Sequence, residues 1–464
     1  MSKCSWLLSR VVVGLACYVA IWGLWFGCGG DYRASESTSG SASSSSEYVS
    51  SGYDGGSYSY ERSTSAGNSN SNTVGNSNSN SNSSAGSYNP GPQAGTLTAG
   101  SFDDHYFPDV FLEFVDKMAS STTPASLKQR NLIEVLDRQG KPIADAIVVI
   151  SHKGKELVRL RTGSDGQALF LGAIDNPKKL SPLTLTAQKG TESTTLKPKS
   201  EEPVWNVTFS SVTAQPVSKL DVAFVVDATG SMGDEIRFLK AETHSIVQNI
   251  VKQSPNFTIR FALIVYRDQG DAYVTRVFDF ADLKTFQNNL NPQSANGGGD
   301  EPEAMDEALL KASQLSWGVD GRARMLFLLA DAPPHHQAIA GTFSLMNGFR
   351  KRGIRVYPVA ASGVKNTAEY VMRVGAFKTL ARYIFLSDDS GYGSPHADPN
   401  IPPHKPTKTK DKPCYNIEKL NSLMVRMMLS ELRGKPLPPS KEDVLRQVGT
   451  VKGNICDPSE MNKP

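Results

Sequence analysis

The run D-A-T-G-S-M, Asp227 to Met232, brings together a carboxylate and two hydroxyls in one short stretch. It follows L-D-V-A-F-V-V, Leu220 to Val226, in which Val222 to Val226 is a continuous apolar run, typical of a strand covered on both faces. A glycine between the hydroxyls allows a tight loop, so Thr229 and Ser231 can bring their oxygens close to that of Asp227. Three explanations are open here: a metal site, a phosphorylated aspartate or a capped turn.

Two further loops add carboxylates. The segment G-G-G-D-E-P-E-A, Gly297 to Ala304, contributes Asp300, and Asp331 ends the apolar run M-L-F-L-L-A. Carboxylates and hydroxyls, with no His or Cys among them, suit a hard divalent cation. We expect Mg²⁺, with Mn²⁺ or Ca²⁺ as alternatives.

Strands and helices alternate around these loops. This order predicts a doubly wound α/β fold, in which ligands bind at the carboxyl ends of the strands. We expect strands at 222–226, 258–266, 274–280, 325–330, 354–360 and 383–386, and helices at 234–252, 302–315, 343–352 and 368–374.

Four motifs occur in the order found in one known family. D-A-T-G-S-M, Y-R-D, G-G-G-D-E-P-E and A-D-A-P-P-H resemble the von Willebrand factor type A domain, over about residues 219–388. The resemblance implies a metal-ion-dependent adhesion site, in which the cation bridges to an Asp or Glu of a partner protein. It assigns the D-x-S-x-S positions to Asp227, Thr229 and Ser231, and the third-loop aspartate to Asp331. Asp300 stands where the family has a threonine, which makes the site more anionic.

Two further residues, Asp268 at the end of a strand and His335 just past Asp331, are candidates for supporting the metal ligands. An enzyme is the competing interpretation, since D-A-T-G-S also resembles the D-K-T-G-T loop of P-type ATPases, where Asp227 would be a nucleophile. Those enzymes also need a G-D-G-x-N-D type motif and a lysine loop. A-D-A-P-P-H is not that motif, so we expect no enzyme.

The amino terminus predicts export. Two basic residues precede the apolar segment 11–27, and the following Gly27-Cys28 pair resembles the lipobox of bacterial lipoproteins, although Trp25 stands where that family prefers leucine. We expect a lipid anchor on Cys28 in the bacterial cell envelope, periplasmic or at the surface. A plain signal peptide or an uncleaved anchor are the alternatives. Cys414 and Cys456 are expected to form a disulfide, the alternative being two unrelated thiols.

The remaining chain divides by composition. Residues 29–100 are rich in Ser, Asn and Gly and predict a disordered tether. Short β-branched runs in 128–213 predict a small β-sandwich, and D-x-x-G-x-P-I-x-x-A-x-V there resembles the carboxypeptidase regulatory-like, or transthyretin-like, domain. The expected parts are a signal at 1–28, the tether at 29–100, a possible helix at 101–127, the sandwich at 128–213, the A domain at 217–390 and a C-terminal helix and stapled tail at 391–464.

The formal net charge of +3 over 464 residues gives no reason to expect nucleic-acid binding. The resulting hypothesis is a membrane-tethered protein that binds a protein partner through a divalent cation. One alternative is a structural component of an envelope assembly whose contacts need no metal.

Overall fold

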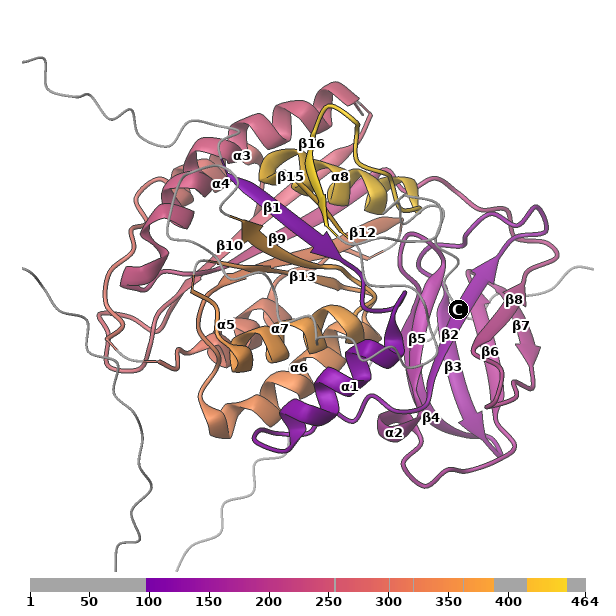
Figure 1. The fold of residues 1–464 in the computed structure, drawn as a ribbon. Coiled ribbons are helices and arrows are strands. Elements are labelled where there is room, and N and C mark those ends of the chain that lie inside the picture. Colours follow the sequence, from indigo (N-terminus) through magenta and orange to yellow (C-terminus); the bar gives the residue numbers. More distant parts are fainter. Residues whose placement is uncertain are drawn as a thin grey trace, which may run out of the picture. The chain divides into compact units, whose positions relative to one another are not determined.

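The computed structural model describes residues 97–253, 256–299, 301–319, 321–361, 363–387 and 415–448 (Figure 1). Four predicted functional residues, Cys28, Asp300, Cys414 and Cys456, lie outside the described residues. The predictions of a lipid anchor, of one metal ligand and of a disulfide therefore stay predictions. In the described ranges, no helix combines the length and the apolar character that a membrane crossing requires.

A mixed sheet of nine strands forms the centre of the larger module, which we call the α/β module. Its order is β11-β10-β9-β12-β13-β14-β1-β15-β16. The five strands from β10 to β14 in this order run parallel, as predicted for a doubly wound fold. The strands are β1 (Thr98–Phe102), β9 (Lys219–Asp227), β10 (Thr258–Tyr266), β11 (Thr275–Ala281), β12 (Arg322–Ala330), β13 (Arg355–Ala360), β14 (Tyr383–Ser387), β15 (Tyr415–Lys419) and β16 (Val444–Val448).

Helices cover both faces of this sheet because successive side chains of a strand point to opposite faces. In β9, Ala223 and Val225 pack into one apolar core, and Val222, Phe224 and Val226 into the other. The first core is closed by α1 (Pro108–Ala119), α5 (Met305–Gln314), α6 (Ile339–Lys351) and α7 (Asn366–Lys378), and the second by α3 (Gly233–Gln253), α4 (Leu283–Leu290) and α8 (Leu420–Arg433) (Figure 1).

The sheet is larger than the sequence suggests. Strand β1 lies between β14 and β15, so residues 98–100, which we assigned to the tether, pair inside the sheet. The amphipathic pattern of 417–432 predicted the C-terminal helix, and its start is corrected: 417–419 belong to β15, and α8 begins only at Leu420. A fragment starting near residue 217 would therefore lack an internal strand.

Residues 130–208 form a separate β module of two sheets, β5-β2-β8 and β4-β3-β6-β7, which share one apolar core around Trp205. Whether it belongs to the carboxypeptidase regulatory-like family stays a prediction. Its elements are β2 (Arg130–Leu136), β3 (Ile147–His152), β4 (Lys155–Arg161), β5 (Gln167–Leu171), α2 (Gly172–Asp175), β6 (Thr184–Lys189), β7 (Glu192–Leu196) and β8 (Val204–Thr208).

Buried ion pairs join the two modules. Three aspartates of the β module each pair with an arginine of the α/β module: Asp145 with Arg324 at 2.9 Å, Asp165 with Arg355 at 2.6 Å and Asp175 with Arg350 at 2.6 Å. All six side chains are largely buried, with exposed fractions of at most 13%. The β module is thus fixed to the sheet rather than acting as a loose spacer.

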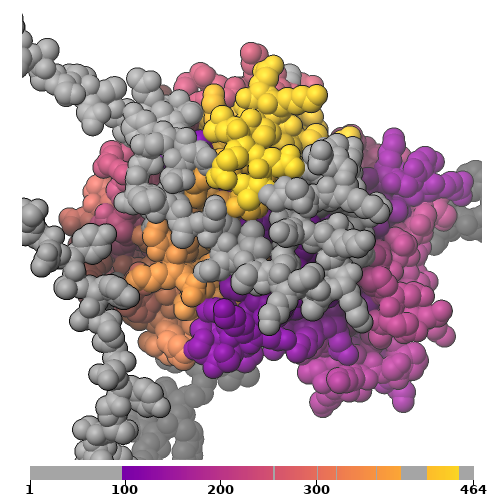
Figure 2. Space-filling model, in the orientation of Figure 1, coloured from indigo at the N-terminus to yellow at the C-terminus, as the bar shows by residue number. Residues whose placement is uncertain are grey.

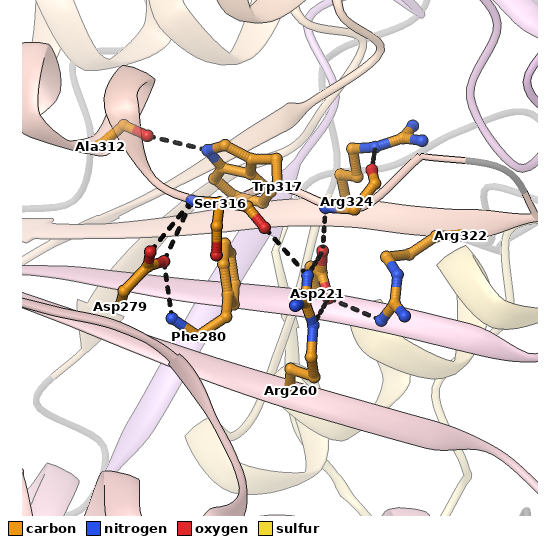
Figure 3. A network of polar contacts seen from close by, with 10 residues as sticks. Asp221, Arg260, Asp279, Phe280, Ala312, Ser316, Trp317, Arg322 and Arg324 are labelled. Atoms are coloured by element: carbon orange, nitrogen blue, oxygen red, sulfur yellow. Dashed lines mark hydrogen bonds and ion pairs between the residues drawn. The ribbon is translucent and has the colours of Figure 1, made fainter.

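A second network ties the strands together at the amino end of the sheet (Figure 3). The carboxylate of Asp221, fully buried on β9, accepts hydrogen bonds from Arg260 of β10 at 2.9 and 2.7 Å and from Arg322 of β12 at 2.7 Å. Gly318 donates its N–H to the same carboxylate at 2.8 Å. This buried carboxylate therefore fixes the positions of β9, β10 and β12 relative to one another. The candidate site lies at the opposite end of these strands.

Lys378, a buried lysine on α7, makes the stability of the α/β module depend on pH. Lys378 is only 1% exposed, and burial, followed by the nearby Arg350 cation, lowers its pKa from 10.5 to about 7. Between these two pKa values the unfolded chain holds a proton that the folded chain lacks, so this residue makes stability rise as the pH increases from about 7. We expect Lys378→Met to remove that slope and to stabilise the fold at pH 7 by about 1–3 kcal/mol. Urea denaturation at pH 7 and 9 measures both effects, and equal slopes in the two proteins would contradict the assignment.

Candidate functional site

The predicted metal loops meet at one edge of the sheet. Strands β9 and β12 are parallel neighbours, with Val226 beside Leu329, so the residues that follow them emerge side by side. These residues are Asp227, the last residue of β9, and Asp331, which directly follows β12. The placement that the apolar runs predicted for these two carboxylates agrees with the structure.

Asp227 has one occupied and one free oxygen. Its side chain is 0% exposed, and Oδ1 accepts hydrogen bonds from the Thr229 backbone N–H at 2.9 Å and from the Thr229 hydroxyl at 2.7 Å. The Thr229 and Ser231 hydroxyl oxygens are 3.4 Å apart. Asp227 Oδ2 is buried and has no hydrogen-bond partner at normal distance and angle among the described residues, although the buried Tyr266 hydroxyl lies close to this carboxylate. The predicted motif therefore gathers its three oxygen side chains, and one carboxylate oxygen has no partner.

Glu303 is a site residue that the sequence did not identify. We expected it in the first turn of a helix, but α5 begins at Met305, and Glu303 lies in the preceding loop with only 4% of its surface exposed. Gly298, at φ +69°, lets this loop approach: an added Cβ would lie 2.9 Å from Glu303 Oε1 and 3.0 Å from Thr229 Cβ. Glu303 and Thr229 therefore both lie next to Gly298, close enough for the Asp227 charge to act on Glu303.

Three carboxylates of this edge each keep a buried oxygen that has no hydrogen-bond partner in the described part of the chain. These atoms are Asp227 Oδ2, Glu303 Oε2 and Asp331 Oδ1. A buried anionic oxygen without a partner is costly, so such atoms indicate that something outside the chain completes them.

The electrostatics agree with this interpretation. Burial, together with the Asp331 charge, raises the pKa of Asp227 to about 7. Burial and the neighbouring charges of Asp227 and Asp268 raise the pKa of Glu303 to about 8. Burial also raises the pKa of Asp331 above its usual value. Like charges at close range in a buried site oppose ionisation, and a bound cation would relieve that repulsion.

The surrounding loops are fixed by polar contacts. The Arg267 guanidinium donates to the Ala228 carbonyl at 3.1 Å and to the Ser294 carbonyl at 3.0 Å. Asp268 Oδ1 lies 2.7 Å from His335 Nε2, so the two residues named as possible supports contact each other beside the site. His335 orients Asp268, whose charge acts on Glu303.

These residues fit a hard divalent cation, although acidic groups alone do not complete its shell. Among the described residues, no three Asp, Glu, His or Cys side chains form a metal-binding group by themselves. The hydroxyls of Thr229 and Ser231 would have to contribute, together with water or with Asp300, which lies outside the described residues. Oxygen donors that are hydroxyl, carboxylate and water are those that Mg²⁺ accepts.

Comparison with known proteins concerns the α/β module. Residues 221–392 match the family model of the von Willebrand factor A domain. An ariadne-like RING finger protein of Acanthamoeba polyphaga mimivirus is 38% identical over 125 residues, and the human von Willebrand factor A domain-containing protein 7 is 36% identical over 123 residues. Each match covers 26% of this chain and only 12% of the relative. Among solved structures, BatB from Bacteroides thetaiotaomicron is 13% identical, with a TM-score of 0.28, over 39% of this chain and 93% of that one.

Proposed function

We propose that this chain, whose residues 221–392 form a von Willebrand factor A domain, binds a protein partner through a divalent cation. Domains of this family are in general interaction modules rather than enzymes. The observation that carries the proposal is the set of three buried carboxylate oxygens without partners, Asp227 Oδ2, Glu303 Oε2 and Asp331 Oδ1, beside two hydroxyls.

In this proposal Asp227, Thr229, Ser231 and Asp331 hold the cation, with Asp300 as a further ligand from the second loop. We add Glu303 to this set because it is buried, because it and Thr229 both lie next to Gly298, and because its charge and that of Asp227 repel each other. The bound cation supplies a positive charge to which an Asp or Glu of the partner can coordinate. The loops around it, fixed by Arg267, supply the contacts that distinguish one partner from another.

The proposed setting is the bacterial envelope, with Cys28 lipidated and residues 29–96 as the tether. Strand β1 is the first described strand after the tether. Thr98 pairs with Ser387 at the carboxyl end of β14, so the chain enters the sheet at the same edge as the metal loops.

The direct test is calorimetric titration of the compact unit Ser84–Pro464 with Mg²⁺, Mn²⁺ and Ca²⁺. We expect one ion per chain, with a dissociation constant on the order of 10⁻⁴ M, as for extracellular cation-binding modules. At saturation the cation should also raise the melting temperature, because it binds the folded state only. A folded chain that takes up no ion would contradict the proposal.

Partner chemistry is tested by selecting displayed random peptides on the immobilised unit, with Mg²⁺ and with EDTA in parallel. We expect Asp or Glu to be enriched at one peptide position in Mg²⁺ and the enrichment to disappear in EDTA. Equal selection in both buffers would instead favour the alternative of a structural component with metal-independent contacts.

A further inference from the structure

A groove of about 500 Å³ lies at the end of the sheet opposite the metal loops. Val217 and Phe257, which form part of it, come just before β9 and β10, whose other ends carry the metal site. Its remaining walls come from the β module, around Pro142, and from the end of α8, around Leu432. The groove is thus formed by both modules and lies well away from the candidate cation.

The rim of this groove is basic. Lys141, Arg433 and Lys435 line it and are all exposed, and no acidic residue is among its lining. None of the three forms an ion pair with another described residue. Exposed cations that lack intramolecular partners attract anionic groups of a ligand.

Two of the nearby carboxylates are paired inside the structure. Glu431 accepts hydrogen bonds from Ser164 at 2.9 Å and from Tyr357 at 2.6 Å, and Asp165 pairs with Arg355 at 2.6 Å. Asp137 accepts three backbone hydrogen bonds, from residues 139, 141 and 214; these bonds, and also the Lys141 charge, lower the pKa of Asp137. Asp137 therefore offsets part of the Lys141 charge, and the positive charge of the rim comes mainly from Arg433 and Lys435.

The floor of the groove is apolar. Leu432 and Val217 are buried at 3% and 5% exposure, and Phe257 and Pro142 are half-buried. An apolar floor surrounded by cations matches a ligand that carries an apolar side chain between acidic groups.

The groove is also rigid. The α8 helix ends at Gly434, whose φ of +63° lets the chain turn directly against the β module, where an added Cβ would lie 2.5 Å from the Ser164 carbonyl oxygen. Two polar contacts between the modules hold this arrangement in place: the hydrogen bond from Ser164 to Glu431 and the ion pair of Asp165 with Arg355. A preformed groove loses less entropy on binding than one that must close.

Both the C-terminal segment (yellow) and the β module (purple to magenta) reach the face shown in Figure 2.

We propose that this groove is a second binding site, for an acidic peptide segment of a partner protein with a leucine or aromatic side chain between its carboxylates. A membrane surface fits less well. The large hydrophobic side chains that are exposed in the described part of the chain are Val251, Val277, Leu310, Val319 and Leu445, and none of them lines the groove. The rim therefore offers charge without an apolar group to insert into lipid.

The test uses fluorescence anisotropy on the full chain, in EDTA, so that the cation site makes no contribution. The probe is a labelled peptide with one phenylalanine flanked on each side by two glutamates. We expect a dissociation constant on the order of 10⁻⁵–10⁻⁴ M that rises with salt. Replacing the phenylalanine by serine, or the glutamates by lysine, should weaken binding at least about tenfold.

The double variant Arg433→Glu/Lys435→Glu should weaken binding at least about tenfold. The charge-matched control is Lys155→Glu/Lys197→Glu, on exposed positions of the β module outside the groove, and it should bind as the parent does. Circular dichroism confirms that both variants are folded. Equal loss in the control, or equal binding of the serine peptide, would overturn the proposal. The proposal would also be overturned if the parent chain bound phosphatidylglycerol vesicles more tightly than the peptide. It would likewise be overturned if the parent chain formed oligomers and the Arg433→Glu/Lys435→Glu variant did not.

Discussion

Asp227→Ala is expected to abolish uptake of the divalent cation. Asp227 is fully buried at the end of β9, its Oδ1 positions Thr229, and its Oδ2 is one of the atoms without a partner. Groups that only support metal ligands contribute about 10- to 100-fold in affinity, so loss of this central carboxylate should cost more than about 100-fold. Calorimetric titration with Mg²⁺ on the unit Ser84–Pro464 measures the change.

Loss of folding would not explain such a result. In EDTA the variant should stay folded, because burial and the Asp331 charge both disfavour the ionised Asp227 in the folded state, and their relief offsets the loss of the two hydrogen bonds from Thr229. Glu303→Gln should weaken cation binding by about tenfold, since it removes one charge but keeps the shape. The matched control is Glu307→Gln, in the first turn of α5, which should bind Mg²⁺ as the parent does. Unchanged affinity in Asp227→Ala would remove the cation from the proposed function.

The contrast between Asp227 and Glu303 shows what the sequence could predict about the site. Asp227 and Asp331 each follow a long apolar run, so their strands and the shared edge could be predicted before any contact was known. The position of Glu303 depends on contacts between distant loops. Its backbone N–H donates to the Pro333 carbonyl at 3.0 Å, and its carboxylate lies against Gly298. The segment D-E-P-E resembles a capped helix start, and nothing local separates a buried glutamate from a first-turn one.

The strands of the sheet, too, could be predicted from the sequence only in part. The apolar runs predicted the parallel strands β9, β10, β12, β13 and β14, and residues 221–392 match the family model of the von Willebrand factor A domain. The added strands β1 and β15 were missed because each has only five residues. The sequence of β1 lacks alternating apolar residues, and Ile417 of β15 also fits the apolar pattern of the helix that follows it. In β1, T-A-G-S-F, the pairing depends on Gly100, which lies beneath the Phe385 ring of the neighbouring strand with no room for a side chain. Such a fit appears only once distant segments are placed together.

The largest expected effect on stability comes from the joint between the modules. Asp175→Ala should destabilise the fold by about 3–5 kcal/mol, because it leaves the Arg350 guanidinium, 2% exposed, without its counter-ion. Both Arg350 terminal nitrogens donate to this carboxylate, at 2.9 and 2.6 Å, and the Leu171 backbone N–H donates to it at 2.9 Å. The Asp175 charge also offsets the repulsion between Arg350 and the buried Lys378. Urea denaturation followed by tryptophan fluorescence measures the change.

The double variant Asp175→Ala/Arg350→Met separates a buried unpaired charge from a simple loss of contact. It should recover much of the stability, since replacing a buried ion pair by apolar groups is often close to neutral. The exposed pair Arg159–Glu156, at 2.6 Å with side chains 53% and 45% exposed, is the matched control, and Glu156→Ala should cost less than about 1 kcal/mol. If Asp175→Ala cost no more than Glu156→Ala, the joint would not hold the modules rigidly. The groove formed by both modules would then lose its basis as a preformed site, while the cation site, on the opposite edge of the sheet, would be unaffected.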